Sequence, residues 1–406
     1  MMGVRLELRC TPAILRREMS KQCHAAASAQ GILESMNDLL EPYSATERDF
    51  IELLREAVTI QSLSTFEADV SRFFVRWMHK RGFKAEMDGA GSAVGTRGTG
   101  QKEIVLLGHI DTVPGEIPVR IEKNSADKLE LWGRGSVDAK GPFCTFLAAV
   151  SLLPDHILER ARFVCVGAVE EEAASSKGAH HAIAKFSPDH CIIGEPSGYD
   201  TITLGYKGRL VVKARLEKDN FHSAGNDTTA PEDMLRYFAA LEVWAAQFND
   251  AQRLFDSVQV ALQGISSSND GLRQGCEAVI GLRLPPRLGP DEAMRELERV
   301  RLEQGLNTLR ISYTGREEPY RGAKDTPLTR AFRIAMRQHG ITPQLTLKTG
   351  TADMNVVAPL WGCPILAYGP GDSTLDHTPT ERLEIDEYLS AIRVLRDALE
   401  RLVTTG

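Results

Sequence analysis

Residues 103–111 read EIVLLGHID, a short apolar run that leads into a histidine and an aspartate. Apolar, β-branched runs of this length are typical of strands that are buried on both faces of a parallel sheet. Three further runs have the same character: RFVCVGAV (162–169), HCII (190–193) and PILAY (364–368). Helical stretches such as 143–153 separate some of them. The chain is therefore predicted to be α/β, with a mixed, largely parallel sheet sandwiched by helices.

Two helices are predicted before this strand. Residues 44–47 form a capping-box pattern, and apolar residues follow at helical spacing over 50–58 and again over 70–78. Residues 1–43 show little periodicity, and we predict a poorly ordered N-terminal extension there. It is interpreted as a transit peptide, as residues upstream of a start at Met36, or as a frayed end.

The pattern changes between residues 206 and 315. Strand, helix, strand, strand, helix and strand patterns follow over 209–216, 229–248, 256–264, 276–284, 291–303 and 308–313. This is the ferredoxin-like β-α-β-β-α-β order. We predict that 206–315 is an inserted second domain, and that 44–205 together with 316–406 form the main domain.

The composition argues against several classes of protein. The 406 residues carry a formal net charge of −7, which disfavours a broad nucleic-acid surface. No apolar run reaches the roughly 18 residues that a membrane-spanning helix needs. The seven cysteines are scattered without a C-x-x-C pair, which indicates neither a disulfide framework nor a cysteine-based zinc site. We expect a protein of the reducing cytoplasm.

Charged side chains follow the ends of the predicted strands. The carboxyl ends of strands in an open α/β sheet meet at one edge, where ligands collect. Two imidazoles and several carboxylates are the ligands that a pair of borderline divalent metal ions accepts. The pattern therefore favours a dinuclear metallohydrolase. The residues are His109, Asp111, Asp138, the acidic run 170–172, Glu195 and His377.

Each of these residues also has a structural interpretation. A lone histidine is more often a satisfied core residue, the acidic run 170–172 could begin a solvated helix, and Glu195 before Pro196 could belong to a turn. The setting of His109 in GHIDTVP, and the apolar strand that ends at the acidic run, favour a functional site.

The motifs GHIDTVPG, GRGSVDAKG, GAVEEEA, GEP and the late DHTP resemble, in this order, those of the zinc-dependent aminoacylase, glutamate carboxypeptidase and acetylornithine deacetylase superfamily of metallopeptidases. The resemblance covers about residues 46–400. GRGSVDAKGP, SSKGA and TLGYKGRL are most similar to hydrolases that release lysine or ornithine from a small acidic amino-group carrier protein.

The resemblance implies hydrolysis of an N-acyl amino acid amide in lysine or arginine biosynthesis, by a homodimer whose inserted domain serves as lid and dimerisation domain. It implies two divalent metal ions, zinc by preference and cobalt as an alternative. Acetylornithine deacetylase and succinyl-diaminopimelate desuccinylase are alternatives of the same class. A catalytically silent, metal-binding regulatory homologue is the alternative of a different class.

The resemblance also implies a set of ligands. His109 and Glu195 would bind one metal ion, Glu172 and His377 the other, and Asp138 would bridge the two. The register of the acidic run is open by one residue, because the family usually has Asp where Glu170 stands.

Other residues would act around the metals. Asp111, on the same side of an extended segment as His109, can accept the second ring N–H of that imidazole. By resemblance, Glu171 would be the general base, and His222 would polarise the scissile carbonyl, from the partner subunit in dimeric members. Arg283 would bind the substrate carboxylate. Further predicted substrate contacts are Asn269, Gly350 and Thr351, with Asp353 opposite a substrate ammonium group.

Overall fold

The computed structural model describes residues 39–222 and 226–405. The chain divides into two compact units, Met1–Glu52 and Leu53–Gly406. Most of the predicted N-terminal extension lies outside the described residues, and the domain boundaries at 206 and 315 stay predictions. No helix in the described part of the chain is long and apolar enough to cross a membrane.

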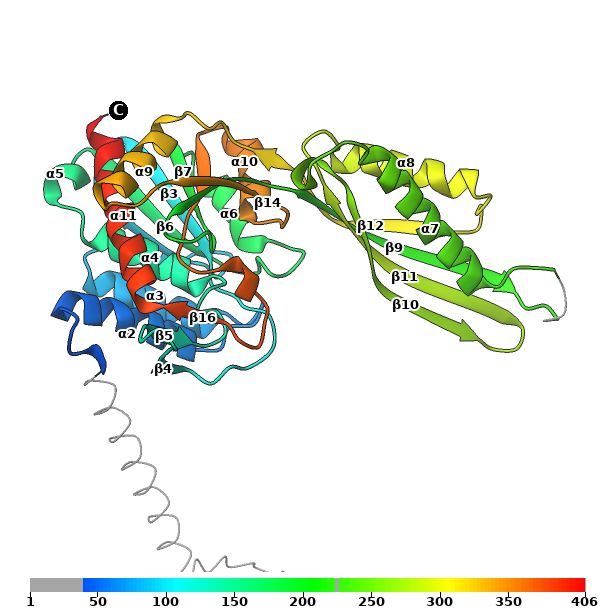
Figure 1. Cartoon of the computed structure of the whole chain (residues 1–406), viewed down its shortest axis with the longest axis horizontal. Coiled ribbons are helices and arrows are strands. Elements are labelled where there is room, and N and C mark those ends of the chain that lie inside the picture. The colour runs from blue at the N-terminus through cyan, green and yellow to red at the C-terminus, as the bar shows by residue number, and fades with distance from the viewer. Residues whose placement is uncertain (1–38, 223–225, 406) are drawn as a thin grey trace, which may run out of the picture. The chain divides into compact units, whose positions relative to one another are not determined.

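A nine-stranded mixed sheet forms the core of the larger unit (Figure 1). Its order is β1-β2-β6-β3-β7-β15-β8-β13, with β14 beside β8. Parallel pairing joins β6, β3, β7 and β15. The strands are β1 Lys84–Met87, β2 Ala93–Arg97, β3 Lys102–His109, β6 Ala161–Ala168, β7 His190–Gly194, β8 Thr201–Tyr206, β13 Tyr320–Arg321, β14 Gln344–Lys348 and β15 Ile365–Ala367. The predicted sheet of four apolar strands is confirmed as the centre of this larger one.

Helices α4, α6 and α10 pack against this sheet. Helix α11 contacts both α9 and α4, and α4 packs on β3 and β6. Helices α6 and α10 contact each other. The side chains of Val105 and Leu107 on β3 pack with Ala179 of α6 and Val357 of α10. Strand β3 is buried at almost every position as a result. The helices are α2 Ala45–Thr59, α3 Ala68–Lys80, α4 Lys140–Ser151, α5 Asp155–Leu158, α6 Lys177–Lys185, α9 Pro327–Gln338, α10 Asp353–Trp361 and α11 Ile385–Thr404.

The predicted capping box at the start of α2 is confirmed. The Ser44 hydroxyl accepts a hydrogen bond from the Glu47 backbone N–H at 3.2 Å, and the Glu47 carboxylate accepts one from the Ser44 N–H at 3.0 Å. Helix α10 was not predicted, because Val356, Val357 and Pro359 give its sequence weak helical character. A small three-stranded sheet, β16-β5-β4, completes this part of the chain. Its strands are β4 Arg120–Lys123, β5 Leu129–Trp132 and β16 Arg382–Glu384.

The β-α-β-β-α-β segment forms its own antiparallel sheet, in the order β10-β11-β9-β12. This is the ferredoxin-like strand order, as predicted. Leu210, Ile280, Tyr237 and Leu297 belong to a core between one face of the sheet and the two helices. The elements are β9 Gly208–Asp219, α7 Ala230–Phe248, β10 Gln259–Asn269, β11 Arg273–Leu284, α8 Pro290–Glu303 and β12 Arg310–Glu317. Strand β10 runs further than predicted, because the polar residues 266–268 pair with β11 and yet carry no apolar signal.

Candidate metal centre

The predicted metal ligands follow the ends of different elements. Strand β3 ends at His109, Glu195 follows β7 directly, and Asp138 precedes α4. The acidic run 170–172 follows β6, which lies next to β3 in the sheet. Because β6, β3 and β7 are parallel, their carboxyl ends meet at the same edge. The predicted convergence of these residues is therefore what the sheet order produces.

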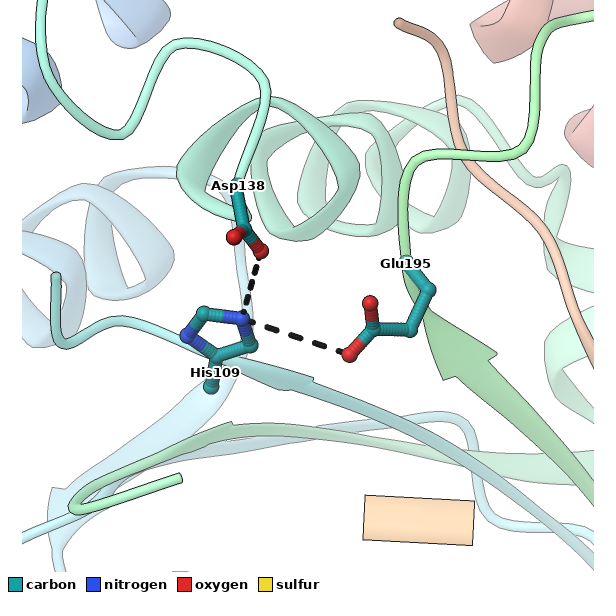
Figure 2. Close-up of side chains that lie close together, drawn as sticks. All are labelled: His109, Asp138 and Glu195. Atoms are coloured by element: carbon teal, nitrogen blue, oxygen red, sulfur yellow. Dashed lines mark hydrogen bonds and ion pairs between the residues drawn. The ribbon is translucent and has the colours of Figure 1, made fainter. Parts of the chain in front are cut away.

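His109, Asp138 and Glu195 form a first group (Figure 2). Nε2 of His109 lies 3.1 Å from Oδ1 of Asp138 and 4.0 Å from Oε1 of Glu195. Two ligands of one tetrahedral zinc-like ion, each about 2.0–2.2 Å from it, lie about 3–4 Å apart. The spacing of these three side chains therefore suits one such ion.

Asp138, Glu172 and His377 form a second group. Nε2 of His377 lies 2.9 Å from Oε1 of Glu172 and 3.1 Å from Oδ2 of Asp138. The two oxygens of Asp138 thus contact two different imidazoles. This arrangement is what a carboxylate needs in order to join two metal ions.

The three side chains of the acidic run 170–172 point to different partners. Oε2 of Glu171 lies 4.0 Å from Nε2 of His109, and Glu172 contacts His377. Glu170 instead accepts a hydrogen bond from the Ser175 hydroxyl and pairs with Lys177. Of the three carboxylates, 171 and 172 therefore point toward the metal groups. Both also form a candidate ligand group with His109, so the assignment of base and ligand between them stays a prediction.

Asp111 is completely buried and joins two parts of the site. Its Oδ1 and Oδ2 accept hydrogen bonds from the backbone N–H groups of Glu171 and Glu172, at 3.1 and 3.0 Å, and Ser64 donates to Oδ2. Nδ1 of His109 lies 3.1 Å from the Asp111 carbonyl oxygen and 3.5 Å from Oδ1. The backbone carbonyl is thus the nearer acceptor for the imidazole, and the carboxylate mainly fixes the acidic run.

Glu381 holds the loop that carries Asp138. Its buried Oε1 accepts hydrogen bonds from the backbone N–H groups of Gly135, Val137 and Asp138, and Oε2 accepts one from Arg134 at 2.7 Å. Sequence reasoning missed this residue, because Glu381 lies in an unpatterned segment far along the chain from its partners.

Negative charge is in excess in the cluster. Burial raises the pKa of Glu171 and Glu195 above the usual range of a carboxyl group, and neighbouring carboxylates add to the rise. Within residues 39–222 and 226–405, both carboxylate oxygens of Asp353 and Oδ1 of Asp376 are buried without a hydrogen-bond partner. Divalent cations would neutralise this charge, and imidazole with carboxylate is a donor set that borderline ions accept. These residues therefore fit a pair of divalent metal ions.

A pocket of about 500 Å³ opens onto the metal groups. Predicted substrate contacts Arg283, Gly350 and Thr351 line it, and Arg283 donates a hydrogen bond to the Thr351 hydroxyl. Asp353 is buried and does not appear in the pocket wall. Tyr206, Lys348 and Asp376 also line the pocket. Of these, Tyr206 and Asp376 were not predicted as site residues. One signal in the sequence pointed to Asp376, because this residue directly precedes the predicted ligand His377.

His222 and Asn269 lie elsewhere. Asn269 pairs with Gln274 at one end of β11, and its side-chain oxygen accepts a hydrogen bond from Asn220, just before His222. Arg283 lies at the other end of β11, about 30 Å away at the usual rise of a strand. The structure therefore does not bring these two residues to the pocket of their own chain.

Comparison with known proteins identifies the family of this chain. The model of peptidase family M20/M25/M40 matches residues 105–401. The [LysW]-lysine hydrolase of Deinococcus radiodurans is 54% identical over 87% of this chain and 96% of the relative. The putative [LysW]-lysine/[LysW]-ornithine hydrolase of Thermococcus kodakarensis is 38% identical over 87% of this chain and 92% of the relative.

Among solved structures, the M20 family metallo-carboxypeptidase Sso-CP2 of Sulfolobus solfataricus has a TM-score of 0.70 and 19% identity, over 89% of this chain and all of that one. It shares the fold. The family and the side chains present support a dinuclear site for divalent metals, and the two groups that meet at Asp138 are its candidate ligands. By its sequence match and its fold, the chain belongs to peptidase family M20/M25/M40, as a metal-dependent hydrolase of amide bonds.

Proposed function

We propose that this chain releases lysine, and also ornithine, from the terminal glutamate of a small acidic amino-group carrier protein. The reaction is hydrolysis of an amide bond, and it belongs to lysine biosynthesis and, for ornithine, to arginine biosynthesis. The observation that carries the proposal is 54% identity to a [LysW]-lysine hydrolase across 96% of that protein. The converging ligands and the neighbouring Glu171 support it.

His109 and Glu195 would hold one metal ion and Glu172 and His377 the other, with Asp138 between them. We propose zinc as the native metal and cobalt as a substitute. When bound, the ions supply Lewis acidity, which polarises the amide carbonyl and lowers the pKa of the attacking water toward about 7.

Glu171 performs the proton transfer. Its carboxylate accepts a proton from the attacking water and delivers that proton to the leaving amine of lysine. Burial raises the pKa of Glu171 above the usual range of a carboxyl group, which makes it a stronger base than an exposed carboxylate. Because Asp111 binds the backbone N–H of Glu171, the base is held beside the metal groups rather than left on a mobile loop.

The positive side chains of the pocket suit a substrate with carboxylates. Arg283 presents a planar guanidinium whose pair of N–H groups matches a carboxylate, and Thr351 orients it. Lys348, from β14, adds a second positive charge to the pocket wall. We assign Arg283 to the carboxylate of the substrate, with Gly350 and Thr351 beside it.

The decisive experiment compares Glu171→Gln with Glu170→Gln, a matched change at the neighbouring carboxylate that contacts Ser175 and Lys177. Release of free amine is measured with carrier-linked lysine, carrier-linked ornithine, N-acetylornithine and N-succinyl-diaminopimelate. We expect carrier-linked lysine to be the best substrate. Glu171→Gln should lower kcat by about 10³-fold or more, as loss of a general base does, and Glu170→Gln should change it by only a few-fold.

Three outcomes would contradict the proposal in different ways. Faster turnover of an acetyl or succinyl substrate would make the chain a deacetylase or desuccinylase. Equal rates for Glu171→Gln and the wild type would remove the mechanism. No turnover of any substrate by metal-loaded protein would favour a regulatory, catalytically silent homologue.

We also propose a homodimer in which His222 and Asn269 serve the partner's pocket. The distance along β11 between these residues and Arg283 supports this, since one chain does not bring them together. Strand β10 is an edge of its sheet, and Leu235 and Val243 of α7 are exposed apolar side chains that a partner would cover. The inserted sheet is thus the proposed dimer interface.

Mixing two inactive variants tests this assembly. Glu171→Gln and His222→Ala are each expected to be inactive. In a mixed dimer, one pocket would receive an intact Glu171 from its own chain and an intact His222 from the other. Recovery of activity after subunit exchange supports the dimer, whereas no recovery, or a fully active monomer in sedimentation, contradicts it.

We also propose a cytoplasmic location. Free thiols accord with this proposal, since a reducing compartment keeps cysteines unpaired. The cysteines concerned are Cys144, Cys165, Cys191, Cys276 and Cys363.

A further inference from the structure

Tyr206, the last residue of β8, lines the pocket and has a hydroxyl group that the site as described so far does not use. Its side chain is only 2% exposed. In the part of the chain that the structure describes, the phenol oxygen is buried and has no hydrogen-bond partner. A buried hydroxyl group without a partner is costly, so a partner from outside the chain is expected.

Tyr206 lies on the metal side of the pocket. Tyr206 lines the same cavity as Asp138, Glu171, Glu195 and His377. A phenol ordinarily has a pKa of about 10. The hydroxyl therefore keeps its proton near neutral pH and is available as a hydrogen-bond donor.

The sheet fixes Tyr206 from two sides. Its Cα is paired with Tyr320 on β13 and with Lys348 on β14. Its carbonyl oxygen accepts a hydrogen bond from Nδ2 of Asn355 at 3.5 Å. A side chain on a backbone held in this way needs little rearrangement to meet a substrate, which is the property that makes a donor effective in a transition state.

We infer that the Tyr206 hydroxyl donates a hydrogen bond to the oxygen of the scissile amide carbonyl as that oxygen gains negative charge. The inference rests on the proposed function. Tyr206 keeps its proton throughout, and no bond to it forms or breaks. A charged oxygen is a stronger acceptor than the carbonyl of the bound substrate, so the hydrogen bond strengthens in the transition state. Tyr206 would thus be a catalytic residue that acts from the same chain as the metal ligands.

The test is Tyr206→Phe in the metal-loaded, full-length protein. We expect kcat for carrier-linked lysine to fall by about 10²-fold, as on loss of an oxyanion donor, with KM within about threefold, since the contact forms mainly in the transition state. Metal content should not change. A phosphinic analogue of the amide, which carries a charged tetrahedral group, should bind more weakly by a similar factor, whereas binding of free lysine should be unchanged.

Tyr313→Phe is the matched control. Tyr313 also has a buried hydroxyl group without a partner among the described residues, but it lies on β12, outside the pocket. This variant should keep the wild-type kcat and the affinity for the analogue. Any change common to both variants would then report a general effect of removing a buried hydroxyl group.

The outcomes separate this inference from the proposed function. A kcat for Tyr206→Phe within threefold of wild type, with Glu171→Gln inactive, would overturn the role of Tyr206 alone. A loss of activity that merely follows a loss of metal or of folded protein would also overturn it. A wild-type protein that hydrolyses no amide would overturn both proposals.

Discussion

The side chains of Asp111 and Glu381 fix the backbone segments that carry the proposed ligands. Each is a buried carboxylate that accepts hydrogen bonds from backbone N–H groups: those of Glu171 and Glu172 for Asp111, and that of Asp138 among others for Glu381. Hydrogen bonds to a charged acceptor are stronger than those between neutral groups. A single residue far along the chain can therefore set the position of a ligand by binding the backbone of that ligand.

Asp111→Asn should weaken the metal site without unfolding the protein. An amide has only one acceptor oxygen, so the N–H of either Glu171 or Glu172 would face an NH₂ group. We expect metal affinity to fall by about 10- to 100-fold, as for other groups that orient metal ligands. Competition against a chelator of known affinity measures this change.

Asp88→Asn is the control for that measurement. Oδ1 of Asp88 also accepts hydrogen bonds from backbone N–H groups, those of Ala90, Gly91 and Ser92. It lies in the turn between β1 and β2, so its replacement should leave metal affinity unchanged. Equal affinity losses in the two variants would contradict the specific role of Asp111.

Among the structural elements, the junction of β8 and β9 links the pocket to the inserted sheet. Lys207 lies at this junction with its side chain fully buried. Its ammonium group donates hydrogen bonds to the carbonyl oxygen of Ser257 at 2.6 Å and to the side chain of Gln259 at 3.3 Å. These contacts join the end of β8 to β10 and to the short 3-10 helix before β10. That 3-10 helix carries Leu254, which lines the pocket.

The buried Lys207 should make stability rise with pH in the alkaline range. Burial lowers the pKa of Lys207 to about 8 in the folded protein, from 10.5. Between these two values the unfolded chain binds more protons than the folded one, so the free energy of unfolding increases with pH. Urea unfolding at intervals from pH 7.5 to about 10.5 should show this rise, and Lys207→Met should reduce it.

Lys213→Met provides the comparison, because Lys213 is an exposed lysine on the same strand, β9. That variant should keep the wild-type pH profile. If Lys207→Met keeps it as well, the buried ammonium group is not the source of the effect.

Over the whole molecule, the metal groups join segments that are distant in the chain. His109 from β3, Glu195 after β7 and His377 near the end of the chain meet at Asp138. Without cations, the clustered carboxylates repel one another and destabilise this arrangement. Bound metal should therefore contribute to folding stability as well as to catalysis.

Removing metal should lower the melting temperature. Binding to the folded state alone adds about 4 kcal/mol of stability when free ligand is a thousandfold above its dissociation constant. Calorimetry of chelator-treated protein, before and after addition of zinc or cobalt, measures the gain. The gain should be smaller in His377→Ala, whereas a melting temperature that does not respond to any divalent ion would contradict the site.

Local patterns in the sequence were enough to predict the central strands, the ferredoxin-like segment and the candidate ligands from His109 to His377. These features depend on residue type and spacing within about ten positions, such as an apolar strand that ends at a charged motif. Local patterns could not predict helix α10, the polar end of β10, or the roles of Glu381 and Tyr206. No short window of sequence distinguishes these residues from ordinary surface or core positions.

The sequence by itself determined which chemical groups are available and which elements carry them. Only the tertiary structure decided which groups meet: that the oxygens of Asp138 contact both His109 and His377, that Glu171 rather than Glu170 points toward the cluster, and that Tyr206, with its buried hydroxyl group, lines the same pocket. The physical reason is that these distances depend on the order in which strands pair across the sheet. That order follows from the packing of the whole core, which no local pattern contains.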